Sequence, residues 1–124
     1  MEFIEASAFT RYLSDYLDDD EYRKLQNELA VKPELGDVMP GTGGFRKLRW
    51  ADPKRGKGRR GGLRIIYFYF AGEQQIWIVM LYGKNETSDL SSKQKKELRS
   101  AIESELRARE SKRLARATRH RRIQ

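Results

Sequence analysis

Cationic side chains carry most of the chemistry that this sequence offers. Residues 52–62, DPKRGKGRRGG, hold five lysines and arginines among four glycines and one proline. Two further cations adjoin strongly apolar segments: Arg64 is the second residue of LRIIYFYF (63–70), and Lys84 follows QIWIVMLYG (75–83). Guanidinium groups bind phosphate through paired hydrogen bonds, and lysine binds it as a point charge. The basic loop 52–62 therefore has three candidate roles: a nucleotide site, a nucleic-acid site or a solvated linker.

A nucleotide site is disfavoured by the context of the loop. The letters GKGRRG (56–61) fit the G-x-G-x-x-G pattern of dinucleotide-binding loops. Such a loop must open a helix, so that the pyrophosphate meets the helix N-terminus. Here a strand-like segment follows instead. The GTGG segment (41–44) lacks the Lys-Ser/Thr pair of a phosphate-binding loop.

The charge of the whole chain is segregated along the sequence. Residues 1–45 carry a net charge of −6, residues 46–64 carry +8, residues 65–106 carry −1 and residues 107–124 carry +7. Concentrated basic blocks attract polyanions, of which nucleic acid is the commonest. The simpler alternative for both blocks is a solvated loop and a solvated tail.

Several classes of site are excluded or not indicated. The sequence has no cysteine, which excludes disulfides and thiolate-based metal sites, and its only histidine, His120, lies in the basic tail. No clustered metal ligands appear, so we expect neither a metal nor another cofactor. The segment MEFIEASAF resembles no secretory signal, and no run of about 20 apolar residues is present. We therefore expect a cytoplasmic protein that does not contact membranes.

The spacing of apolar residues predicts one small α+β domain. Phe3-Ile4 predicts a first strand, and the apolar stripe from Phe9 to Leu17 predicts a helix. A second stripe, from Tyr22 to Leu29, predicts another helix that Asp18–Asp20 can cap and that Pro33 and Gly36 end. The two helices form a predicted hairpin with its aromatic residues in the core.

The second half of the chain predicts a sheet and a final helix. Segments 45–51, 63–70 and 75–83 predict three strands of an antiparallel meander, and residues 36–44 predict a loop. Ser91 or Ser92 can cap a last helix whose apolar positions are Leu98, Ile102 and Leu106. Beyond these positions the apolar face disappears. We therefore expect a domain over 1–108 and a basic extension over 109–124 that is a frayed helix or disordered.

A meander places the start of 63–70 beside the end of 75–83. Arg64, Lys84 and the basic loop are therefore predicted to converge at one edge of the sheet, with Arg64 at the rim and its guanidinium outward. Such a cluster can cleave RNA without histidine. Crowded cations lower the pKa of a lysine, so Lys54 or Lys57 is the candidate base. In this reaction the 2′-oxygen of a ribose attacks the adjacent phosphorus. Arg64 is suited to neutralise the negative charge of the phosphorane that forms, and Lys84 can bind the phosphate or protonate the leaving 5′-oxygen. The predicted RNA-contact residues are Arg46, Arg49, Arg55, Arg59, Arg60, Tyr82 and Asn85.

Four segments together resemble the RelE/ParE superfamily of bacterial toxins, and most closely its HigB-like branch. They are LGDVMPGTGGFRKLRW, the basic loop, GGLRIIYFYF and IVMLYGKNETSDLS, within a resemblance that covers about residues 1–108. The resemblance implies a RelE-like, microbial-ribonuclease-like fold and a toxin–antitoxin function. Such toxins are metal-independent mRNA endonucleases that act on the 70S ribosome and inhibit translation. It further implies a cognate antitoxin, often of helix-turn-helix type, through which operator DNA is bound.

Carried over by position, the resemblance implies catalytic roles for Lys54, Lys57, Arg64 and Lys84. The sequence departs from the family at one position. Many such toxins have a tyrosine after the last cation, and this tyrosine stacks on a base. This sequence has Leu90 near that position, and either Tyr82 or Tyr67 is a candidate substitute. Two alternative functions stay open: a ParE-like inhibitor of DNA gyrase, although that branch generally lacks the full cationic set, and a non-catalytic RNA- or DNA-binding module.

Overall fold

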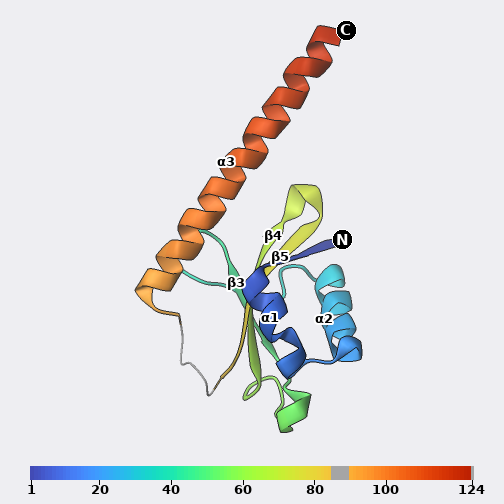
Figure 1. The fold of residues 1–124 in the computed structure, drawn as a ribbon, viewed down its shortest axis with the longest axis vertical. Helices are drawn as coiled ribbons and strands as arrows, with labels where there is room; N and C mark the ends of the chain where they lie inside the picture. The colour runs from blue at the N-terminus through green and yellow to red at the C-terminus, as the bar shows by residue number, and fades with distance from the viewer. Residues whose placement is uncertain (85–89, 124) are drawn as a thin grey trace.

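A computed structural model describes residues 1–84 and 90–123, with side chains as far as residue 119. The fold is α+β, with a mixed five-stranded sheet that has α1 and α2 on one face and the start of α3 on the other (Figure 1). The elements in chain order are β1 (Glu2–Glu5), α1 (Ser7–Tyr16), α2 (Asp19–Val31), β2 (Asp37–Val38), β3 (Arg46–Trp50), β4 (Leu63–Phe70), β5 (Gln75–Gly83) and α3 (Ser92–Ile123).

The sheet has the strand order β1-β5-β4-β3-β2. Strands β3, β4 and β5 form the predicted antiparallel meander, and β1 joins β5 in parallel at one edge. The prediction of a loop over 36–44 is wrong at Asp37–Val38, because these two residues form β2, which pairs with β3. Glycines 41, 43 and 44 all have positive φ values, which turn the chain so that this two-residue strand can pair.

The helical hairpin covers the face of the sheet to which Ile65 and Ile78 point. Its buried residues include Phe9, Leu25 and Leu29, all with 0% exposure. The predicted cap is confirmed, because the Asp18 side chain accepts a hydrogen bond of 2.8 Å from the backbone N–H of Glu21. One aromatic residue of the first stripe differs from the prediction: Tyr12 is 47% exposed.

Helix α3 packs on the opposite face of the sheet over its N-terminal part, as far as Arg109. The predicted cap is confirmed: the Ser91 Oγ accepts from the Gln94 N–H at 3.1 Å, and the Gln94 Oε1 accepts from the Ser91 N–H at 2.9 Å. Leu98 and Ile102 pack in the core of this face. The helix then passes the predicted boundary at 108 without a break and projects away from the sheet (Figure 1). Among the described residues, no helix is long and apolar enough to cross a membrane.

Candidate nucleic-acid interface

Three side chains from three neighbouring strands form one row across the sheet. Arg49 of β3 pairs with Arg64 of β4, and Arg64 pairs with Tyr82 of β5. Alternate residues of a strand face opposite sides. Leu63 and Ile65 belong to the core under α1 and α2, so Arg64 faces the α3 side. The row Arg49–Arg64–Tyr82 therefore lies on the sheet face that the helical hairpin leaves uncovered.

Lys84 lies at the same end of the sheet as this row. Its backbone N–H donates to the Gly62 carbonyl at 2.9 Å, next to the Leu63–Gly83 pair that closes the β4–β5 ladder. The predicted meeting of Arg64 and Lys84 is therefore confirmed at the level of the backbone. The Lys84 side chain is exposed.

Arg64 does not project outward, as the sequence suggested. The residue is only 8% exposed, and its guanidinium turns back onto the end of the basic loop. Its Nη2 donates to the Arg60 carbonyl at 3.0 Å, and its Nη1 donates to the carbonyls of Leu63 (3.1 Å) and Arg59 (3.3 Å). Backbone carbonyls satisfy the donors without neutralising the charge, which explains how an arginine can be buried here without a carboxylate or phosphate partner among the described residues.

The electrostatic surroundings of Arg64 are unfavourable to its charge. Burial lowers the pKa of the Arg64 guanidinium, and the nearby charge of Arg49 lowers it further. Interaction with the phenol group of Tyr82 acts in the opposite direction. The guanidinium still carries its proton at neutral pH. An anion bound between the two arginines would offset the repulsion and the lost solvation.

A hollow at the outer edge of β3 extends this positive region. Four cations line it, together with one carboxylate and two leucines: Lys47, Arg49, Arg59, Arg60, Asp37, Leu35 and Leu48. Arg49 and Arg60 are exposed, and Lys47 is half-buried. Lys47 and Arg49 share the face of Arg64, because they stand two residues apart on β3. The sequence signal that could indicate this second cationic strand face is the mixture of cationic and apolar residues in FRKLRWA (45–51), which places Lys47 and Arg49 on one side of a strand.

The basic loop itself is folded. The backbones of Asp52 and Lys57 exchange two hydrogen bonds, of 2.8 and 2.9 Å, around a 3-10 turn at Pro53–Arg55. Gly62 returns the chain to β4 in a space too small for a side chain: an added Cβ would lie 2.4 Å from the Trp50 carbonyl oxygen. The loop therefore offers a defined backbone, and its carbonyls hold Arg64.

Most cations of the loop point to the helical hairpin and not to Arg64. Lys54 donates to the Ser14 carbonyl at the end of α1, at 2.5 Å. The Arg55 guanidinium lies 4.7 Å from the centre of the Tyr16 ring and pairs with Asp52 at 3.2 Å. Arg59 lies 4.4 Å from the centre of the Trp50 ring and pairs with Glu28 of α2 at 2.9 Å. The predicted convergence therefore does not extend to these three side chains.

Most of the other residues predicted to contact RNA or to act in catalysis also lie outside the row. Arg46 donates to the carbonyls of Gly36 (2.8 Å) and Glu34 (3.2 Å), and it stands on the face of β3 opposite to Arg49, so the structure gives it a structural contact outside the row. Tyr67 is fully buried, and Tyr82, although it is in the row, is only 7% exposed and packs in the core on the α3 side. The prediction that one of these two rings stacks on a base is therefore wrong for both, because neither ring is open to solvent. Leu90 packs in the core on the α3 side. Lys57 is half-buried, and Asn85 lies outside the described residues.

The site thus combines a fixed guanidinium, a second guanidinium, a phenol and an exposed ammonium group on one sheet end. These groups can bind a phosphodiester and neutralise charge that develops on it. Within residues 1–84 and 90–119, no cluster of three or more histidine and carboxylate side chains could hold a metal ion. No protein-family model matches the chain.

Proposed function

We propose that this protein is a metal-independent endoribonuclease that cuts mRNA on the 70S ribosome and is the toxin of a toxin–antitoxin pair. The observation that carries the proposal is the row Arg49–Arg64–Tyr82 with Lys84 beside it. The exposed Arg49 can offer its guanidinium fork to the oxygens of a phosphodiester, whereas Arg64, whose guanidinium is held by backbone carbonyls, contributes its positive charge. A sheet strand holds both residues more rigidly than a loop does. The α+β order of elements is compatible with the RelE-like fold that the resemblance implies.

In the proposed reaction, a ribose 2′-oxygen attacks the adjacent phosphorus in line, and the bond to the 5′-oxygen breaks. This leaves a 2′,3′-cyclic phosphate and a free 5′-hydroxyl. Arg64, oriented by the loop carbonyls, and Arg49 neutralise the charge that builds up on the phosphorane oxygens. Lys84 donates the proton to the leaving 5′-oxygen. These assignments use the groups that the sheet brings to one end.

Of the two lysines predicted as the base, Lys57 is the better candidate. The Lys54 ammonium is engaged by the Ser14 carbonyl on the other side of the loop. Lys57 makes no side-chain hydrogen bond or ion pair with any described residue, and only its backbone is engaged by Asp52. We assign the removal of the 2′-proton to Lys57.

The cellular partners in this proposal rest on the resemblance to RelE/ParE toxins. They are the ribosome with its mRNA, a cognate antitoxin and, through the antitoxin, operator DNA. The basic sheet end gives a physical reason for an antitoxin with an acidic segment, because complementary charge steers association and covers the site.

One observation favours a second function, a nucleic-acid-binding module without cleavage. Part of the predicted cationic set is used internally: Lys54, Arg55 and Arg59 all have partners within the fold. A module of this kind would bind RNA tightly and in a salt-dependent way, with no cut on or off the ribosome.

Primer extension on mRNA-programmed ribosomes tests the proposal. We expect cuts in phase with codons for the wild-type protein and a loss of at least about 100-fold in rate for the Arg49→Gln/Lys84→Gln variant, the cost of removing charge stabilisation from a transition state. The matched control is Arg23→Gln/Lys24→Gln on the exposed side of α2, which removes the same charge and should cut normally. If the wild-type protein binds RNA but never cuts it, the second function is favoured. If the Arg49→Gln/Lys84→Gln variant cuts mRNA at the normal rate, the proposed site is wrong.

A further inference from the structure

The distal part of α3 carries its positive charges on one face. Arg109, Lys112, Arg113, Arg116 and Arg119 follow a spacing of i, i+3, i+4, i+7 and i+10, which places them on one side of a helix. Arg107 and Leu114 fall on the opposite side. At 1.5 Å per residue, this cationic face is about 15 Å long.

The cationic face forms one wall of a groove. The other wall is the tip of the β4–β5 hairpin, where Phe70 and Glu73 line the groove opposite Arg109, Lys112, Arg113 and Arg116 of α3. Figure 1 shows α3 rising past this hairpin and away from the body of the protein. The groove is therefore open along the distal half of the helix.

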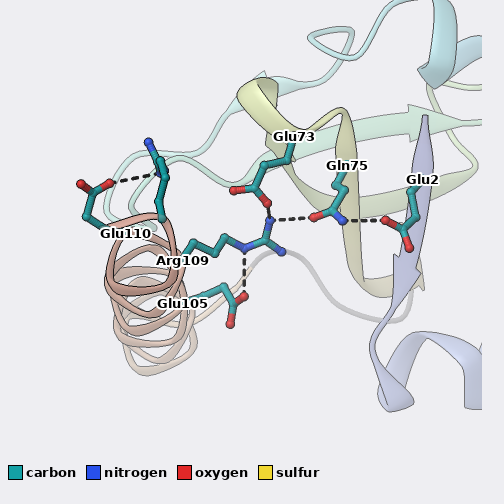
Figure 2. Close-up of polar contacts among 7 residues, drawn as sticks. Glu2, Glu73, Gln75, Glu105, Arg109 and Glu110 are labelled. Atoms are coloured by element: carbon teal, nitrogen blue, oxygen red, sulfur yellow. Dashed lines mark hydrogen bonds and ion pairs between the residues drawn. The ribbon is translucent and has the colours of Figure 1, made fainter. Parts of the chain in front are cut away.

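Arg109 fixes this wall, and carboxylates compensate its charge there. Its guanidinium stacks on Phe70 at 3.7 Å and pairs with Glu73 of the hairpin tip and Glu105 of α3. It also donates to the Gln75 side chain at 2.6 Å, as Figure 2 shows. With two carboxylates on Arg109, the positive charge that remains for a ligand belongs to the four cations beyond it.

Carboxylates of the protein neutralise little of the positive charge of those four cations. Within residues 110–119 the only carboxylate is Glu110, which pairs with Arg113 at 3.2 Å while both side chains stay more than half exposed. Exposed pairs of this kind contribute little. Lys112, Arg116 and Arg119 make no side-chain hydrogen bond or ion pair with any described residue, and all three are exposed.

The chemistry of the face favours a phosphate backbone over an acidic helix as its ligand. A docked helix needs apolar anchors at the repeating positions of its groove. The apolar residues of this groove lie at its hairpin end, where Arg109 covers the Phe70 ring. Beyond Leu106 the positions of α3 that face the groove are cationic, and the exposed Leu114 falls on the opposite side of the helix. Three of the four cations are arginines, which bind phosphate through paired donors.

We propose that the cationic face of α3 is a second RNA-binding surface, which grips phosphates without regard to sequence. It is separate from the row at the other end of the sheet, because Arg64 and Phe70 lie six residues apart on β4, about 20 Å at 3.3 Å per residue. The inference shares an RNA ligand with the proposed function and does not depend on cleavage.

The test is the binding of a labelled 20-base-pair RNA duplex across a salt series. The Lys112→Gln/Arg113→Gln/Arg116→Gln variant keeps good helix formers in place and removes three charges. We expect at least a tenfold loss of affinity and a shallower slope of log affinity against log salt, by about 2 to 3. The matched control, Arg11→Gln/Arg23→Gln/Lys24→Gln, loses the same charge from α1 and α2 and should keep the slope within about 1 of the wild type.

Unchanged duplex affinity in the α3 variant would overturn the inference. So would a variant that loses only the binding of a poly-glutamate peptide, since that result would assign the face to an acidic protein. Failure of the proposed function gives a different result. If the wild-type protein never cuts mRNA but the α3 variant still loses duplex affinity, the cleavage proposal falls and this one stands.

Discussion

Arg49 and Arg64 lie directly opposite each other on β3 and β4, on the sheet face that α1 and α2 leave uncovered. Like charges in this position destabilise an antiparallel pair. Their proximity and the burial of Arg64 both lower the pKa of its guanidinium. The pair is costly for the free protein and favourable for a bound anion, which is the balance expected of a binding site rather than of a structural contact.

Removal of one charge from this pair should make the protein more stable. We expect Arg49→Gln to raise the free energy of unfolding by about 0.2–1 kcal/mol at low salt, the cost of facing like charges. Arg46→Gln, three residues earlier on the same strand, should lower it by about 1.5–3 kcal/mol, because it removes a charged donor from two carbonyls. Urea unfolding measures both. A destabilised Arg49→Gln protein would mean that the two arginines do not repel each other.

The loop carbonyls that hold Arg64 depend on the absence of a side chain at Gly62. A Cβ there would lie 2.4 Å from the Trp50 oxygen and 2.7 Å from the Gly58 oxygen. We expect Gly62→Ala to lower the free energy of unfolding by about 1–3 kcal/mol through overpacking. The neighbouring Gly61→Ala is the control, since its Cβ would meet nothing within 4 Å and its φ is not positive. Equal thermal midpoints for the two variants would contradict this role of Gly62.

Tyr67 links the sheet to the segment after α2. Its hydroxyl donates to the Pro33 carbonyl at 2.7 Å and accepts from the Gly36 N–H at 2.9 Å. Tyr67→Phe would leave a buried N–H without its partner, which costs about 1–3 kcal/mol. The exposed Tyr12→Phe is the control, and urea unfolding at neutral pH should find it unchanged.

The same tyrosine should also affect the stability at high pH. Burial raises the pKa of Tyr67 above its usual 10.0. Above pH 10 the unfolded chain loses this proton while the folded protein keeps it. Stability should therefore fall as the pH rises, by about 1.4 kcal/mol per pH unit for a fully protonated buried tyrosine. Tyr67→Phe should make this fall less steep; an equal slope in both proteins would show that the phenol ionises freely in the folded state.

Local sequence signals were enough to predict most helices and strands and to predict which backbone segments meet at the site. The bounds predicted for β4 and β5 are those of the structure, and the predicted caps Asp18 and Ser91 are confirmed. Each of these features depends on a few consecutive residues or on a strict period. The meeting of Arg64 and Lys84 then follows from hairpin geometry alone.

The directions of the loop side chains could not be predicted in this way. Lys54 and Arg59 reach partners that stand 40 and 31 residues away, on α1 and α2. No pattern within the basic loop indicates which helix packs over it. Long flexible side chains choose partners that only the tertiary structure brings near. For a related reason the sequence left a frayed helix and disorder open for residues 109–124, because the contacts of Arg109 include the distant hairpin residue Glu73.

Arg109 should determine how firmly the distal half of α3 is held to the sheet. It stacks on Phe70 of the sheet. Figure 2 shows that it also joins the helix to Glu73 and Gln75, and that Gln75 in turn donates to Glu2 of β1, at 2.6 Å. Lysine keeps the charge but cannot form the same fork or stack on the ring in the same way. We therefore expect Arg109→Lys to speed amide hydrogen exchange in residues 103–119, by a factor that corresponds to about 1–2 kcal/mol. Exchange in α2 should not change, and Arg113→Gln, an exposed neighbour, should leave both regions alone. Slow exchange in Arg109→Lys would mean that helix propensity alone, without the contacts of Arg109, keeps the distal helix formed.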